Sequence, residues 1–551
     1  TFIPSHAQSL IPGVELKAEL GEEYSTTTQT SANVRLDYNR SFGHHNLAAL
    51  LGVGADRTHY QLRTLSASDF FNESDMDNIG SANTYLPIMD AYARGGLNST
   101  YARVSYDYAQ RYLTELSLRS DASSKFGPNN RTAVFPAVSL GWRLGNEQFM
   151  AGSCSWLDDL KLRLSWGKTG STNVDDFSYL RYYSKGGRYG EKPGVWLERN
   201  LPNRDIRWEI TTEYNGGIDF SFFDHRLYGS IDLYNRTTKG ALVNSPYLAE
   251  SGMNSYTSNL IDMSNRGFEL ELGGDIVRTA DFTWSTSFNI ASNRNKVLKL
   301  NGANLNSQMQ DLIVEGEPVG VIKGFRTKGI AKDQAEIDRL NAQAAAKGYG
   351  AYQTSLGVGD YILEDVNGDG RITSDDRTVI GSPLPKFFGG WNHTLTYRNV
   401  DLSLFMQFSQ GGKAFYSDVG LDLESTLGQS ITRETFGRTW TPERREALFP
   451  RLVYGQYSSY NAKTNDRMIY STSYLRMKNI TLTYRLPKAA LRVVGLQSAS
   501  VFAMVTNLFT LTAWPGLDPE LVGSGIHRGQ GNDADPYPLS RTVSFGVHLQ
   551  F

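Results

Sequence analysis

The sequence has almost no cysteine and lacks any long apolar run. A single Cys among 551 residues excludes a disulfide framework and a metal cluster built on thiolates. No segment reaches the roughly 20 consecutive apolar residues of a membrane-spanning helix, so a helical membrane protein is excluded. The start, Thr1–Pro4, lacks the charged and apolar regions of a secretory signal. We therefore expect a mature chain or an internal fragment.

The chain also has no excess of either charge. Its 55 Lys and Arg residues nearly balance its 57 Asp and Glu residues, which argues against nucleic acid or an acidic membrane surface as a partner. Aromatic residues make up 12% of the chain and hydrophobic residues 40%, which argues against disorder. A large β-rich protein remains, either soluble or a membrane β-barrel, and hydropathy does not separate the two.

Apolar and polar residues alternate in segments of about ten residues, the length that a tilted strand needs to cross a bilayer. In each segment one face is apolar and the other is polar or small. The strands of a soluble β-sandwich alternate in the same way, so one such segment does not distinguish a sandwich from a membrane barrel. The clearest segments are Arg131–Gly145, Asp159–Lys168, Arg207–Phe222, Asp281–Ser292 and Val400–Ser409.

Short turns and long connections alternate along the chain, with two connections of intermediate length, Ser123–Asn130 and Asn146–Asp158. The short turns are Phe42–His45, Ala109–Arg111, Phe223–His225, Thr279–Asp281 and Arg398–Val400. The long connections are Leu62–Gly96, Gly170–Ile206, Gly240–Asp262, Lys296–Pro385, Gly411–Thr472 and Thr512–Leu539. Outer-membrane barrels have short periplasmic turns and long extracellular loops. We therefore predict an all-β fold, a transmembrane antiparallel β-barrel with roughly sixteen strands in this chain.

The last segment of the chain alternates without a break and ends on Phe551. Loop parity places this end on the short-turn side. We predict that Phe551 is the signal that the barrel-insertion machinery reads, and an ordinary edge strand is the alternative.

The longest connection, residues 296–385, is predicted to be an extracellular insertion with two local motifs. Residues 331–347 are rich in Ala, Gln, Leu and Lys and predict a short helix. Residues 365–376 follow the spacing of an EF-hand calcium loop, with Gly370 at the sharp turn. The predicted metal ligands are Asp365, Asn367, Asp369, the backbone carbonyl of Arg371, and Asp376.

Two features separate this loop from a standard EF-hand. Its last ligand position is Asp instead of the longer Glu, and the preceding segment, residues 357–363, reads as extended instead of helical. Ile372 is expected to pin the loop to a neighbouring core. We predict a structural Ca²⁺ or another hard cation, and a turn-rich loop without an ion is the alternative.

Catalytic templates are missing from the sequence. It contains no G-x-S-x-G, H-E-x-x-H or G-x-x-x-x-G-K-[ST] motif. Cys154 is interpreted as a small apolar residue, with a nucleophile as the remote alternative. We therefore predict that the protein is not an enzyme and has no catalytic cofactor.

Several segments together resemble the SusC/RagA-type TonB-dependent transporters of Bacteroidetes outer membranes. They follow the family's order and span most of the chain, so the combination is specific although each segment alone is weak. The segments are FPAVSLGWR at 135–143, LKLRLSWGKTG at 160–170, NRGFELEL at 265–272, the 365–376 loop with RTVIGSPLP at 377–385, NLF at 507–509 and GLDPE at 516–520.

The resemblance implies a barrel of about 22 strands that imports oligosaccharides or oligopeptides across the outer membrane. It also implies a SusD-like surface lipoprotein as lid, TonB as the energy source, and a dimer of SusC/SusD units. Residues 1–551 are then expected to be the C-terminal part of the transporter, with the plug domain outside this chain. Substrate-binding residues remain unknown.

Missing strands have a physical consequence. Unpaired backbone groups in lipid cost several kcal/mol each, so a chain or segment that carries plug and first strands is expected to contact residues near Val14–Leu20 and Thr542–Phe551.

Two other functions stay open. One is a secreted, calcium-stabilised β-rich protein that binds or cleaves glycans, and the other is a plain diffusion porin.

Overall fold

The structure is a computed structural model of the chain. It describes residues 2–3, 17–70, 78–86, 88–150, 155–181, 183–190, 192–197, 200–303, 305, 312–424, 431–452, 460–487, 489, 491, 495–521 and 539–551. Cys154 lies outside the described residues.

The described residues form one sheet of 18 strands, in which neighbours along the chain pair antiparallel. Fifteen of the strands have nine residues or more, close to the count that the sequence predicts. These are β2 (Glu19–Phe42), β3 (His45–Phe70), β5 (Met89–Tyr108), β6 (Tyr112–Ser123), β7 (Thr132–Arg143), β8 (Leu157–Ser171), β12 (Glu209–Phe222), β13 (Leu227–Pro246), β14 (Ser255–Arg278), β15 (Phe282–Lys299), β20 (Phe387–Tyr397), β21 (Val400–Gln410), β24 (Tyr474–Arg485), β25 (Ser498–Thr512) and β26 (Thr542–Gln550). The three short members are β1 (Phe2–Ile3), β4 (Ala82–Tyr85) and β11 (Asn200–Leu201).

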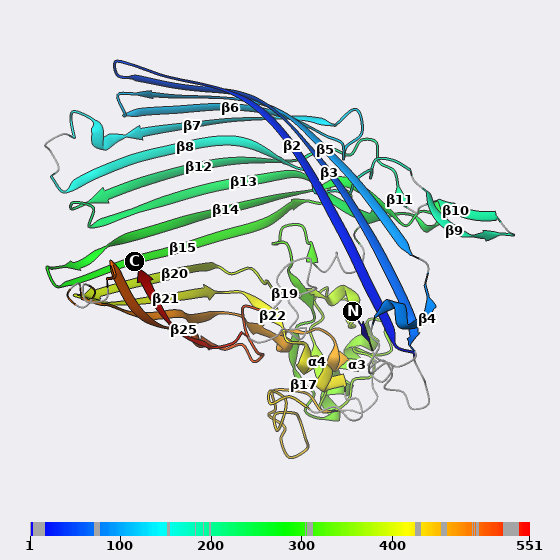
Figure 1. Ribbon diagram of the computed structural model, residues 1–551. Coiled ribbons are helices and arrows are strands. Elements are labelled where there is room, and N and C mark those ends of the chain that lie inside the picture. Colours follow the sequence, from blue (N-terminus) through cyan, green and yellow to red (C-terminus); the bar gives the residue numbers. More distant parts are fainter. Residues whose placement is uncertain are drawn as a thin grey trace.

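The strands stand side by side as a curved wall (Figure 1). Short turns gather at one end of the wall together with the C-terminus, and the long connections leave from the other end. The five predicted short turns are confirmed, but the alternation is not strict, because the connection from β6 to β7 at the long-connection end is shorter than the one from β7 to β8 at the short-turn end. Among the described residues the outer sides of the two edge strands are nearly unpaired, because β2 meets only β1 there, over two residues, and β26 pairs only with β25.

Two predicted loops are wrong. Most of Gly240–Asp262 belongs to strands, because β13 continues to Pro246 and β14 starts at Ser255. Most of Leu62–Gly96 belongs to strands, because β3 continues to Phe70 and β5 starts at Met89. β2 and β3 pair without a break from Glu19 opposite Ser68 to Phe42 opposite His45. The parts of β2 and β3 toward the long-connection end are rich in Thr and Ser. These residues pair well in a sheet but show no alternation of apolar and polar side chains. The alternation therefore marks only part of each strand.

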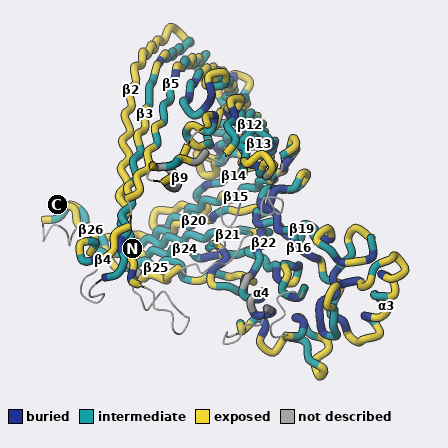
Figure 2. Tube along the Cα trace, turned by 90° about the vertical axis from the view of Figure 1, so that its right-hand side faces the viewer, coloured by how far each residue is buried: buried dark blue, intermediate teal, exposed yellow. Residues whose placement is uncertain are grey.

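The connections β15–β20 and β21–β24 fold together into one compact unit, which we call the insert (residues 312–386, 411–424, 431–452 and 460–473). It hangs from the end of the wall that carries the long connections (Figures 1 and 2). Its elements are β16 (Ile322–Gly324), β17 (Thr327–Ile330), α3 (Gln334–Ala346), β18 (Tyr361–Leu363), η4 (Ser374–Asp376), β19 (Thr378–Gly381), β22 (Lys413–Phe415), α4 (Ser417–Glu424), η5 (Tyr460–Ala462), η6 (Asp466–Met468) and β23 (Ile469–Ser471).

The predicted helix at 331–347 is confirmed as α3. Asp333 caps its N-terminus, because the Asp333 carboxylate accepts a hydrogen bond from the Glu336 N–H at 2.9 Å. Ile337, Leu340 and Ala344 lie on the buried side of the helix and join the core of the insert. The extended geometry predicted for residues 357–363 is confirmed only at β18 (Tyr361–Leu363), because residues 358–360 form a turn.

The insert is more than the predicted loop with a helix, because its core draws on three connections. Leu363 from the first, Phe449 from the second and Trp514 from the connection after β25 belong to the same buried cluster. Figure 2 shows buried residues gathered in the insert, whereas β2 is exposed along most of its length.

Smaller elements complete the described structure. They are η1 (Ile79–Ser81), η2 (Leu144–Asn146), β9 (Tyr183–Tyr189), β10 (Lys192–Leu197) and η3 (Ala249–Ser251). None of the helices in the described ranges combines the length and the apolar character needed to span a membrane.

We expect Leu363→Ala to destabilise the insert by about 2–5 kcal/mol, because Leu363 is fully buried and the change leaves a cavity. The measurement is the rate at which protease cuts the insert of the intact receptor. Val366→Ala, at a side chain that is 44% exposed, is the control. Equal cutting rates in the two variants would contradict a packed core.

Candidate functional site

The wall has two chemically different faces. Directly opposite residues of an antiparallel pair lie on the same face, and so do alternate residues of one strand. Ile218 lies opposite Ile231, Ile231 opposite Leu270, and Leu270 opposite Ile290. Farther along, Leu402 lies opposite Leu482. We call the face that carries these residues the apolar face and the opposite one the polar face.

The apolar face is continuous from β2 to β26 and is not covered by other parts of the described chain. Leu36 of β2 is 70% exposed, Leu164 of β8 is 62% exposed and Phe545 of β26 is 80% exposed. A water-soluble protein rarely leaves so large an apolar surface in contact with solvent. A lipid environment accounts for all these side chains at once, since an outer-membrane barrel carries an apolar band around its outside.

The centre of the polar face carries an ion network on three adjacent strands. The guanidinium of Arg163 on β8 donates to Asp219 on β12 at 2.7–3.0 Å and to Asp232 on β13 at 2.9 Å. Both carboxylates are thus bound by the same cation in a planar, two-pronged geometry. All three side chains remain partly accessible from the polar side.

Gly217 makes room for this network. It lies opposite both Arg163 and Asp232 in the register of the sheet. A Cβ at Gly217 would lie 2.6 Å from Asp232 Oδ1 and 2.7 Å from Arg163 Nη2. Only glycine therefore lets the guanidinium reach across β12.

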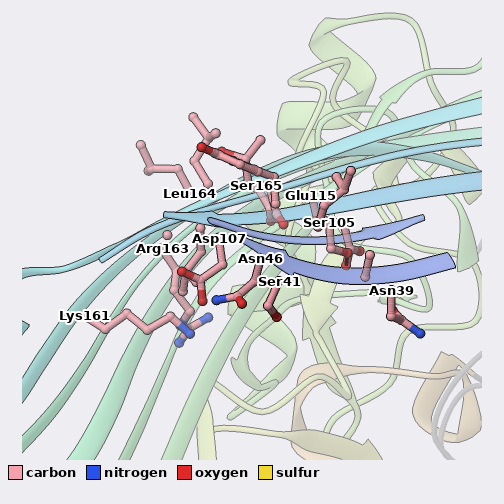
Figure 3. A pocket seen from close by; sticks show the side chains of 18 of the residues that line it. Asn39, Ser41, Asn46, Ser105, Asp107, Glu115, Lys161, Arg163, Leu164 and Ser165 are labelled. Atoms are coloured by element: carbon pink, nitrogen blue, oxygen red, sulfur yellow. Dashed lines mark hydrogen bonds between the residues drawn. The ribbon is translucent and has the colours of Figure 1, made fainter. Parts of the chain in front are cut away.

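A hollow of about 560 Å³ lies beside the network. Its polar lining includes Asn39, Asn46, Glu115, Lys161 and Arg163, from β2, β3, β6 and β8. In Figure 3, Lys161 and Arg163 extend to one side of the strands and Leu164 to the other. The hollow offers donors and acceptors suited to a hydrated solute or a polar protein surface.

A buried cation attaches the connection after β25 to the polar face. Arg476 of β24 is 1% exposed and lies opposite Gln407 and Thr510. Its guanidinium donates to both Asp518 oxygens, at 2.6 and 2.7 Å, and also to Glu520. Asp518 and Glu520 belong to the GLDPE segment singled out in the sequence, and this network explains its acidic residues.

Inside the insert, a second buried pair holds two connections together. The Arg451 guanidinium donates to both oxygens of Asp360, at 2.7 and 3.1 Å. The hydrogen bond to Asp360 raises the pKa of Arg451, and burial raises the pKa of the nearby Tyr361 phenol. Both groups therefore keep their charge state across the physiological range, which suits a structural role.

The calcium-like loop is preformed by hydrogen bonds to its acidic side chains. Asp365 accepts from the N–H groups of Gly368 and Gly370, at 2.7 and 2.8 Å. Asp369 accepts from the Arg371 N–H at 2.9 Å. Ile372 is 4% exposed and belongs to the core of the insert, as predicted.

Asp376 has a structural task in the same loop. It is fully buried, and its two oxygens accept from the N–H groups of Val366 and Thr373, each at 2.8 Å. Asp365, Asn367 and Asp369 supply the oxygen donors that hard cations prefer. Among the described residues, however, no three His, Cys, Asp or Glu side chains converge as a metal site does. The ligand set, including Asp376 and the Arg371 carbonyl, stays a prediction.

Phe551 lies at the short-turn end, directly after β26, and is 82% exposed. Val547 and Leu549 precede it on the apolar face, since Val547 lies opposite Val501. The position that sequence parity predicts for Phe551 therefore agrees with the structure. Its role as an insertion signal stays a prediction.

A curved antiparallel wall with a lipid-facing apolar side and a hydrated polar side defines the class of outer-membrane β-barrel proteins. The family model "TonB dependent receptor-like, beta-barrel" matches residues 8–508. The chain belongs to this TonB-dependent receptor family, which places it in the outer membrane. The family is one of receptors and transporters, not of enzymes.

Curated relatives agree with this assignment. TonB-dependent receptor P3 of Formosa agariphila is 30% identical over 98% of this chain and 54% of its own length. TonB-dependent receptor SusC of Bacteroides thetaiotaomicron is 30% identical over 98% of this chain and 54% of its own length. The chain therefore spans about half the length of these relatives. The resemblance to SusC/RagA-type transporters is confirmed.

Solved structures support the fold. A structure described as the RagAB peptide transporter superposes with a TM-score of 0.82 at 24% sequence identity. The match covers 100% of this chain and 58% of that one.

Sequence reasoning did not find the Arg163 network. The signal that was available is the cations Lys161 and Arg163 at two inward positions of LKLRLSW, with Asp219 and Asp232 on segments of the same alternation. The partners lie 56 and 69 residues away from Arg163. Only the strand register brings them together.

We expect Leu164→Arg to lower the free energy of unfolding of the intact receptor in lipid vesicles by about 2–4 kcal/mol. The reason is that this substitution places a charge on the lipid-facing side near the middle of β8. Ser165→Arg puts the same side chain on the polar face one residue away, and we expect a much smaller loss. Urea titration of the vesicle-embedded protein measures both. Equal losses would contradict the assignment of the two faces.

Proposed function

We propose that this chain forms most of the barrel of a transporter that imports large nutrients, oligosaccharides or oligopeptides, across the outer membrane. The observation that carries the proposal is the two-faced wall of a TonB-dependent receptor family member, with a polar, partly accessible inner surface. A hydrated oligomer needs such a surface to cross the lipid region. Energy would come through TonB, so the chain itself needs no nucleotide site.

The alternative of a secreted glycan-binding protein or glycan-active enzyme is less well supported. Such a protein would have to expose Leu36, Leu164 and Phe545 to water. It also leaves the sorting of short and long connections unexplained.

The edges of the wall support a further part of the proposal. β2 and β26 present rows of backbone donors and acceptors, and in lipid each unpaired group costs several kcal/mol. We propose that another chain or segment supplies the remaining strands, pairs with β2 and β26, and carries the plug. The polar hollow beside Arg163 faces the lumen, where a plug surface would lie.

Partners follow from the family. The relative named SusC and the structure named RagAB support a SusD-like or RagB-like lipoprotein as the partner of this chain. The insert, which lies at the end with the long connections, is the surface we propose for that lid. A dimer of such two-protein units stays a prediction.

We expect deletion of the gene from the source bacterium to abolish growth on one class of oligomer, while growth on the corresponding monomer continues. Growth curves on oligosaccharide and oligopeptide mixtures measure the effect, and the intact gene restores growth. The rescue should disappear in cells that lack TonB. Rescue without TonB would instead indicate a diffusion porin.

We also propose that the loop at residues 365–376 binds Ca²⁺ or another hard cation to stiffen the insert. Asp365, Asn367, Asp369 and the Arg371 carbonyl would hold the ion, with Asp376 as the remaining candidate ligand. A weak site suffices outside a cell, where calcium is millimolar.

Calcium should slow proteolysis of the insert in the intact receptor, relative to a sample with chelator. Asp369→Asn keeps the hydrogen-bond acceptor but removes a charge, so we expect it to need about tenfold more calcium for the same protection. Asp375→Asn, at an exposed position outside the ligand set, should behave as wild type. Identical calcium curves for the two variants would rule out a site at this loop.

A further inference from the structure

A row of cations interrupts the apolar face near the long-connection end of the wall. Arg266 of β14 lies directly opposite Arg294 of β15, and Lys296 follows on the same face of β15. On the other side of this row, Phe268 continues the apolar face. Like charges placed directly opposite each other destabilise a strand pair. An anion bound between these cations would therefore stabilise the strand pair.

The described residues do not supply that anion. Among the described residues, no carboxylate lies within 4.0 Å of the Arg266, Arg294 or Lys296 charges. Arg266 Nε donates to the neutral Asn235 side chain at 3.1 Å. The cations of the Arg163 network differ, since Arg163 pairs with Asp219 and Asp232.

These cations border a hollow of about 770 Å³. The lining contains no acidic residue. Lys386, directly before β20, also lines the hollow, but from the polar side of the wall, because Phe388 two residues later lies opposite Ala291. The hollow forms because β15 and β20 pair only up to Ala291 opposite Phe388. Beyond that point β15 stays paired with β14 but has no strand partner on its other side among the described residues, and Gly316 and Pro318 of the connection line the gap.

The depth of the row identifies its surroundings. β14 reaches its short turn at Arg278, twelve residues after Arg266. At about 3.3 Å per residue and a tilt of about 40°, this distance is about 30 Å along the membrane normal. The apolar band of a barrel is about 25 Å tall. Arg266 and Arg294 therefore lie at the outer edge of the band, at the level of the outer-leaflet headgroups.

We propose that Arg266, Arg294 and Lys296 bind the phosphate group of an outer-leaflet glycolipid. The phosphate neutralises the opposed arginines, and the acyl chains lie on the apolar face below, along Phe268 and the residues that follow it. A free phosphate would use the same cations but would gain nothing from the apolar neighbours. The proposal depends on the membrane location and not on which nutrient is imported.

The test is native mass spectrometry of the intact, detergent-solubilised receptor with a phosphorylated lipid A. We expect R266Q/R294Q to weaken lipid binding by about tenfold or more, because each basic residue near the membrane surface contributes to anionic lipid affinity. K332Q/R339Q removes two exposed cations from the insert and is the matched control. It should bind lipid as wild type does. A heat-dependent shift on a gel confirms that each variant is folded.

Two further samples separate lipid from free anion. Dephosphorylated lipid A should bind wild type no better than R266Q/R294Q binds the phosphorylated form. Inorganic phosphate at millimolar concentration should not displace the lipid. Displacement by phosphate, equal binding of both lipid forms, or unchanged binding by R266Q/R294Q would each overturn the proposal.

Discussion

The pairing of backbone hydrogen bonds between neighbouring strands is the constraint on which the rest of the structure depends. In lipid each strand must meet a partner along its length, and the resulting pleat sends alternate side chains to opposite faces. One geometric rule thus produces both the apolar face around Leu164 and the polar face around Arg163. It also explains why the nearly unpaired outer sides of β2 and β26 need strands from elsewhere.

Much of the wall can be predicted from sequence because its signals are local. Val400–Ser409 alternates within a few residues, and β21 forms there. The helix α3 carries its own cap and buried stripe, and the 365–376 spacing lies within one turn-rich segment. The prediction failed for Leu62–Gly96 because β2 and β3 extend beyond the lipid region, where both faces meet water and no alternation is selected.

The candidate sites were harder to predict because their partners are distant in sequence. Arg163 meets Asp219 and Asp232 only through the register of three strands, and Arg476 meets Asp518 only after a connection folds back. The core of the insert likewise combines Leu363, Phe449 and Trp514. Composition and spacing show that such residues exist, but the strand order determines which of them meet.

The shared core of the insert has a mechanical consequence. A loop that connects two strands of a hairpin can move about its two ends. The insert is instead connected to the wall through β15, β20, β21 and β24, and Trp514 adds a contact from the connection after β25. Rotation about any single hinge would shear the packing around Leu363 and Phe449. A force applied to the insert is therefore transmitted to several strands of the barrel at once.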